Sequence, residues 1–127
     1  MNLVNKIVDL NQLDANDVLW DNLIELTQKG WTARPIFESV RRGERKNQDF
    51  LANIIYDNDR PIAWGIRIMY SSHYAPELWL YTHPDYRCKG IQKNMVIPYW
   101  DSMNEKYKVC QVFHSQKKVF SYLKNRL

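Results

Sequence analysis

LYTHPDYRCKGIQ, residues 80–92, is the segment that decides the fold. It starts in an apolar strand expected over residues 77–82, passes through a turn, and opens a helix expected over residues 91–105. The first N–H groups of a helix lack intrahelical acceptors, and the helix dipole adds positive potential. Gly90 lets a ligand approach the backbone, while Arg87 and Lys89 add charge. The segment predicts an anion site suited to a pyrophosphate; a plain basic loop is the alternative.

The spacing of Arg87 and Gly90, with Thr82, Pro84 and Tyr86 before them, carries a resemblance. It is similar to the signature of the Gcn5-related N-acetyltransferase (GNAT) family: Arg or Gln, any two residues, Gly, any residue, then Gly or Ala. The resemblance implies acetyl-coenzyme A as co-substrate and no metal. It implies that the loop backbone holds the pyrophosphate and that the preceding strand pairs with the pantetheine arm. The implied cofactor-binding residues are Leu80, Tyr81, Thr82, Arg87, Cys88, Lys89, Gly90, Ile91 and Gln92.

Gln92 departs from the pattern, because the family has Gly or Ala at its position. A glutamine side chain there is expected to crowd the cofactor. The expected consequence is that Gln92→Gly tightens cofactor binding.

Tyr122 carries a second resemblance, because it stands seven residues after Ser115. Family members often have Asn at the first position and a Tyr at the second, where the phenol protonates the departing thiolate. The resemblance therefore implies that Tyr122 is the general acid. The alternative is that Tyr122 packs its helix against the sheet.

The general base has two candidates and no decisive signal. Glu77, at the start of the strand before the loop, is the first candidate, and His83 is the second. Glu77 could equally be an ordinary charge at a strand end, and a bound water could also serve as base.

The elements around this segment predict one mixed α/β domain over residues 1–127. Caps at residues 14–16 and 29–30 bound a first helix, and Pro98 is expected to kink the helix over residues 91–105. Alternation and turn residues indicate a hairpin of residues 50–56 and 61–70. The other expected elements are strand 6–10, helix 35–42, strand 108–113 and helix 115–125.

The resemblance implies a mostly antiparallel sheet flanked by helices, without the family's final two strands. Strand 108–113 would then be a sheet edge, and its apolar residues predict self-association, most simply as a homodimer.

Charge and composition limit the kinds of ligand and partner that the chain is expected to bind. The net charge of +4 favours anionic ligands, and residues 41–46 form a basic run that a solvated helix end would also explain. No nucleic-acid-binding motif, disulfide framework or zinc spacing is present, so nucleic acid is disfavoured. No apolar run is long enough to span a membrane, and no signal peptide begins the chain, so we expect a cytoplasmic protein.

Together these observations predict an acetyl-coenzyme A-dependent N-acetyltransferase that acts on an amine of a protein or small molecule. Arg87, Gly90 and Tyr122 favour this enzyme. Gln92, the missing strands and the undecided base favour the alternative, a catalytically inactive GNAT-like binding or inhibitory module.

Overall fold

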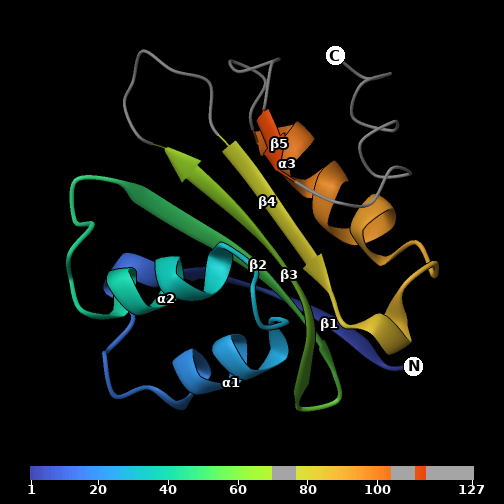
Figure 1. The fold of residues 1–127 in the computed structure, drawn as a ribbon. Coiled ribbons are helices and arrows are strands. Elements are labelled where there is room, and N and C mark those ends of the chain that lie inside the picture. The colour runs from blue at the N-terminus through green and yellow to red at the C-terminus, as the bar shows by residue number, and fades with distance from the viewer. Residues whose placement is uncertain (70–76, 104–110, 114–127) are drawn as a thin grey trace.

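The computed structural model describes residues 1–69, 77–103 and 111–113 of the chain. Its strands form one sheet in the order β1-β2-β3-β4-β5, in which β1 to β4 are antiparallel and β5 runs parallel to β4. The helices α1 and α2 cover one face of this sheet, and α3 covers the other (Figure 1). The strands are β1 (Leu3–Asp9), β2 (Asp49–Asp57), β3 (Arg60–Met69), β4 (Glu77–Thr82) and β5 (Gln111–Phe113). The helices are α1 (Val18–Leu26), α2 (Ala33–Arg41) and α3 (Ile97–Met103), with one-turn helices η1 (Leu10–Gln12) and η2 (Pro84–Tyr86) and a π-helical turn η3 (Gln92–Val96).

The mixed α/β architecture and the order of elements up to β5 are as predicted. The first strand begins at Leu3, three residues before the prediction, because it is a mostly exposed edge strand with no buried alternation to mark it. The helix predicted to begin at Ile91 opens instead with the π-helical turn, whose wider hydrogen-bond ring sequence periodicity does not indicate. The last predicted helix, residues 115–125, lies outside the described residues.

A cluster of aromatic side chains fills the space between the sheet and helices α1 and α2. Trp64 of β3 stacks on Tyr81 of β4 with ring centroids 5.7 Å apart, and Phe37 of α2 meets Trp64 edge-on at 5.3 Å. Trp20 and Leu23 of α1 are fully buried in the same cluster. These rings commit the α1–α2 face of β3 and β4 to the core.

The other face of the sheet packs against η3 and α3. Leu80 of β4 lies in this second core with Val96 and Trp100. Gly65 of β3 is required here, because a Cβ added to it would lie 2.3 Å from the Val96 Cγ1 atom. The helix that follows the β4 turn is therefore held close to the sheet.

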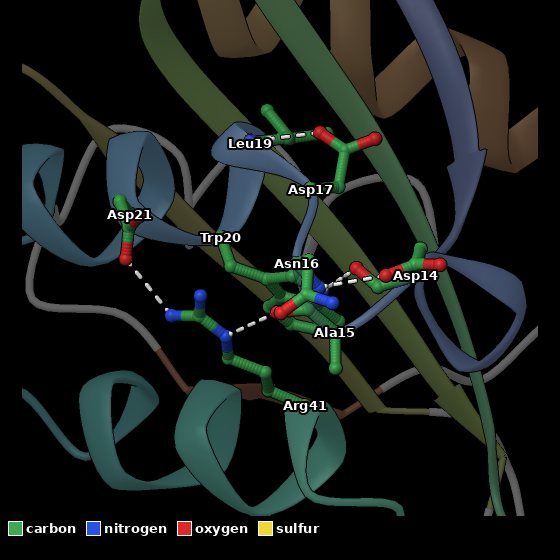
Figure 2. Close-up of polar contacts among 8 residues, drawn as sticks. All are labelled: Asp14, Ala15, Asn16, Asp17, Leu19, Trp20, Asp21 and Arg41. Atoms are coloured by element: carbon green, nitrogen blue, oxygen red, sulfur yellow. Dashed lines mark hydrogen bonds and ion pairs between the residues drawn. The ribbon is translucent and has the colours of Figure 1, made fainter.

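Polar contacts join α1 to α2, as Figure 2 shows. Asp17 caps α1 by accepting from the Leu19 backbone N–H at 2.9 Å. The Arg41 guanidinium of α2 donates to the Ala15 carbonyl and to Asp21, both at 2.8 Å.

The basic run at residues 41–46 is engaged within the chain. Besides Arg41, Arg42 pairs with Glu44, Arg45 donates to Ser39 and Gln48, and Lys46 donates to the Asn11 carbonyl. These contacts favour the solvated helix end over a binding patch.

Gly65→Ala should lower the free energy of unfolding by about 1–3 kcal/mol, because the new methyl group overpacks the contact with Val96. Urea denaturation measures this. In a Val96→Ala background the same substitution should cost much less. Equal costs in both backgrounds would contradict the close approach.

Candidate functional site

The chain between β4 and the following helix turns in two steps. In the first step His83 caps η2: its Nδ1 atom accepts the Asp85 backbone N–H at 3.1 Å, and its carbonyl accepts from the Tyr86 N–H at 2.8 Å. In the second step Cys88 and Gly90 adopt positive φ angles of 63° and 74°. The positive φ is easy for Gly90 and uncommon for Cys88. The loop therefore has a defined shape before the helix begins.

This shape leaves a run of backbone donors unpaired. The first helical hydrogen bond after the turn runs from the Asn94 N–H to the Gly90 carbonyl, at 2.8 Å. Among the described residues, no hydrogen bond of standard geometry reaches the backbone N–H groups of residues 88–92. Successive free N–H groups at a helix start form a site for an anion, and the dipole strengthens it.

Arg87 holds the loop against the end of β4. Its Nε atom donates to the Thr82 carbonyl at 2.9 Å, and its guanidinium lies over the Tyr81 ring, 5.6 Å from the centroid. Its Nη2 atom is buried and meets no acceptor among the described residues. Arg87 thus positions the loop and keeps its Nη2 donor for another acceptor. Lys89 is exposed, and its ammonium group lies over the Tyr86 ring.

Tyr86 ties the loop to the end of β2. Its hydroxyl donates to Asp57 at 2.6 Å, and the Asn2 backbone N–H donates to the same carboxylate. The Tyr86 bond lowers the pKa of Asp57 below its ordinary value, with the Asn2 bond as second cause. The same bond raises the pKa of Tyr86. The sequence did not indicate this pair, because its members lie 29 residues apart.

The outer edge of β4 is paired only over its first half. Glu77, Leu78 and Trp79 pair with β5, and no described strand pairs with residues 80–82 on that side. Leu80 and Tyr81 are buried to 1% exposure or less, with their side chains in the two cores. A ligand at this edge would therefore meet backbone groups rather than side chains.

Gln92 points into the sheet, so the prediction that it crowds a cofactor is wrong. Its Nε2 atom lies 3.1 Å from the Trp64 carbonyl, 2.8 Å from the Tyr81 carbonyl and 3.1 Å from the Thr82 hydroxyl oxygen. The residue is only 4% exposed. The side chain bridges β3 and β4 and fastens the start of the helix to both strands.

No protein-family model and no curated protein sequence matches the chain closely enough to place it. Solved structures do match. The PaiA N-acetyltransferase of Thermoplasma acidophilum, in complex with coenzyme A, is similar with a TM-score of 0.56 and 20% sequence identity, over 98% of this chain and 89% of that one. The Campylobacter jejuni N-acetyltransferase PseH, in complex with acetyl-coenzyme A, matches with a TM-score of 0.52 and 18% identity, over 96% of this chain and 86% of that one. An aminoglycoside acetyltransferase from an uncultured soil metagenomic sample, in complex with sisomicin, matches with a TM-score of 0.54 and 18% sequence identity, over 97% of this chain and 83% of that one.

The chain has the GNAT fold. At these identities the likeness concerns the fold, so the role of each residue depends on its own surroundings.

Two of the remaining predicted site residues lie at opposite ends of β4. Glu77 begins β4, where its Oε2 atom accepts from the Trp79 Nε1–H at 3.1 Å. It lies about 17 Å along the strand from Thr82, at about 3.3 Å per residue. His83 lies beyond the other end of the strand, with its Nδ1 lone pair used by the Asp85 N–H, which argues against it as the base. Tyr122 and Ser115 lie outside the described residues.

A hollow of about 610 Å³ opens beside the end of β4, on the side of the sheet that carries α1. Its walls come from α1 and the loop after it, the β2–β3 turn and the residues that end β4. They are Asn22, Glu25, Leu26, Gln28, Asp59, Arg60, Pro61, Tyr81, His83 and Pro84. Sequence reasoning missed this hollow, because only the fold brings these three segments together.

Two further features are absent from the described part of the chain. No cluster of three His, Cys, Asp or Glu side chains there could hold a metal ion. No helix there has the length and apolar character needed to cross a membrane.

Gln92→Met should lower the free energy of unfolding by about 1–3 kcal/mol, because the side chain keeps its length but loses the buried amide donor. Gln92→Gly should weaken acetyl-coenzyme A binding rather than tighten it. Urea denaturation and calorimetry measure the two effects. Gln12→Met, on an exposed glutamine, is the matched control. Tighter binding by Gln92→Gly would restore the crowding hypothesis.

Tyr86→Phe should raise the pKa of Asp57 toward the ordinary aspartate value of about 3.9, because the hydroxyl that lowers it is gone. A lowered carboxyl pKa adds stability above the unfolded-state pKa, and this stability is lost as pH falls through the folded-state pKa. The stability difference between the two proteins should therefore shrink below about pH 4. NMR titration of the Asp57 carboxyl carbon measures the shift, and an unchanged pKa would contradict the assignment.

Proposed function

We propose that the chain is an acetyl-coenzyme A-dependent N-acetyltransferase that acetylates an amine of a small molecule or a protein. The observation that carries the proposal is the run of unpaired backbone N–H groups at residues 88–92, in a chain with the GNAT fold. A pyrophosphate there would accept from several of these donors, and Lys89 would add charge. Gly90 would allow the close approach, because it has no side chain.

The free edge of β4 supports the placement of the pantetheine arm. The backbone of residues 80–82 has no described strand partner on its outer side, so the amide groups of the arm could pair with it. The arm would then run from the phosphate loop toward Glu77. In this arrangement the thioester lies on the Glu77 side of the strand.

The reaction assigned to this site is aminolysis of the thioester. Glu77 takes a proton from the acceptor ammonium, and the freed nitrogen attacks the thioester carbonyl carbon. The C–N bond forms and the C–S bond breaks, so the coenzyme leaves as a thiolate. In this proposal the Tyr122 hydroxyl donates a proton to the thiolate.

Lys89→Glu should weaken acetyl-coenzyme A binding about 10-fold or more, because it places a negative charge beside the proposed pyrophosphate. Calorimetry measures this. Lys29→Glu makes the same charge change on the exposed α1–α2 loop and should have much less effect. No heat signal with the parent protein at millimolar acetyl-coenzyme A would refute the proposed binding site.

Gly90→Val would be a poor test of this binding site. The φ of +74° makes a β-branched residue strained at this position, so the variant would change the fold as well as the approach.

Glu77→Gln and Tyr122→Phe should each lower kcat about 100-fold or more while acetyl-coenzyme A affinity stays similar. The glutamine keeps an oxygen for the Trp79 N–H, and the phenylalanine keeps the ring. Steady-state kinetics with a panel of amines measures the effect, with Glu38→Gln on α2 as control. Parallel loss of affinity and stability would assign these residues to structure. Cofactor binding without turnover of any amine would favour the non-catalytic module.

A further inference from the structure

His83, which lines the hollow beside the end of β4, faces more hydrogen-bond donors than it can accept. The Asp85 backbone N–H lies 3.1 Å from the His83 Nδ1 atom, and the Arg60 Nη2 atom lies 3.3 Å from the His83 Nε2 atom. A neutral imidazole has one lone pair and one N–H, and a protonated one has two N–H groups. In every protonation state, at least one donor therefore faces another N–H.

The cap of η2 decides which donor is left over. In the tautomer that lets Nδ1 accept from the second residue after His83, as a capping side chain does, the proton of the neutral ring lies on Nε2, although the Asp85 carboxylate also lies 3.8 Å from Nδ1. The Nε2–H and an Arg60 N–H then face each other at the hollow, with no acceptor between them. One carboxylate or phosphate group beside this pair would accept from both donors, one of which is charged.

The other residues that line the hollow indicate which further groups a ligand would carry. Glu25 and Asp59 are acidic and line the same hollow, so a simple polyanion would be repelled. Leu26 and Pro61 supply apolar surface between the charges. Walls with both signs of charge suit a small molecule with both signs.

We propose that this hollow binds a small zwitterion, a primary amine that also carries a phosphate or carboxylate group, with the oxyanion held between Arg60 and His83. The hollow adjoins β4 at Tyr81, within the strand segment assigned to the pantetheine arm. The hollow lies at the opposite end of β4 from the side assigned to the thioester, so the zwitterion is not assigned as the acetyl acceptor. Its binding does not depend on the proposed N-acetyltransferase function.

The test uses pairs of probes that differ in the oxyanion alone. O-phosphoethanolamine is compared with ethanolamine, and γ-aminobutyrate with butylamine, by NMR titration of the full chain at millimolar concentrations. The zwitterions should bind and the plain amines should bind at least about 10-fold more weakly, because a hydrogen bond to a charged group is lost. The stronger zwitterion shows whether phosphate or carboxylate is preferred. Equal binding of the two members in both pairs overturns the proposal.

Arg60→Ala and His83→Asn should each weaken zwitterion binding about 10-fold or more. Asparagine keeps an oxygen for the Asp85 N–H but removes the Nε2–H donor. Lys29→Ala, which removes one nearby positive charge outside the hollow, should leave binding unchanged. Unchanged binding in Arg60→Ala, or an Nδ1–H tautomer of His83 in ¹⁵N spectra, overturns the proposal.

Titration with acetyl-coenzyme A separates the two proposals. Acetyl-coenzyme A binding with no zwitterion binding overturns the assignment of the hollow and leaves the proposed function standing. Zwitterion binding with no acetyl-coenzyme A binding overturns the proposed function and keeps the hollow as a zwitterion site.

Discussion

The backbone conformation at Cys88 and Gly90 is the constraint on which the candidate site depends. Two positive φ angles close together turn the chain from β4 into the helix, so residues 88–92 enter it without meeting acceptors. Backbone donors left unpaired in this way are usually met by water, a side chain or a ligand. The loop is held in this shape from three sides: Arg87 on the Thr82 carbonyl, Tyr86 on Asp57, and Gln92 on the strands.

Both faces of β4 are buried, so its side chains and its backbone edge have different roles. Its side chains supply both cores, with Tyr81 stacked on Trp64 and Leu80 packed under the helix that follows the loop. A strand used in this way can offer a ligand only its backbone edge, and the edge is free over residues 80–82 among the described residues. The packing that stabilises the fold and the edge proposed to bind the cofactor thus belong to the same strand.

Local sequence patterns predicted the secondary structure around the candidate site. They could not predict the contacts between residues that lie far apart in the sequence. The strand, turn and helix of residues 80–92 follow from apolar spacing, turn residues and Gly90, all within one short segment. The direction of the Gln92 side chain depends on the Trp64 carbonyl, 28 residues away, and nothing local to Gln92 indicates it. The Arg60–His83 pair likewise needs the β2–β3 turn to lie beside the end of β4, which only the assembled sheet provides. The roles of Glu77 and Tyr122 stay predictions.

The central claim is that the unpaired N–H groups of residues 88–92 hold the coenzyme A pyrophosphate. The most direct measurement is a ¹H–¹⁵N NMR titration of the full chain with acetyl-coenzyme A. We predict that the amide signals of residues 88–92 move the most, with smaller shifts along residues 80–82. Saturable binding that leaves the amides of residues 88–92 unshifted would contradict it.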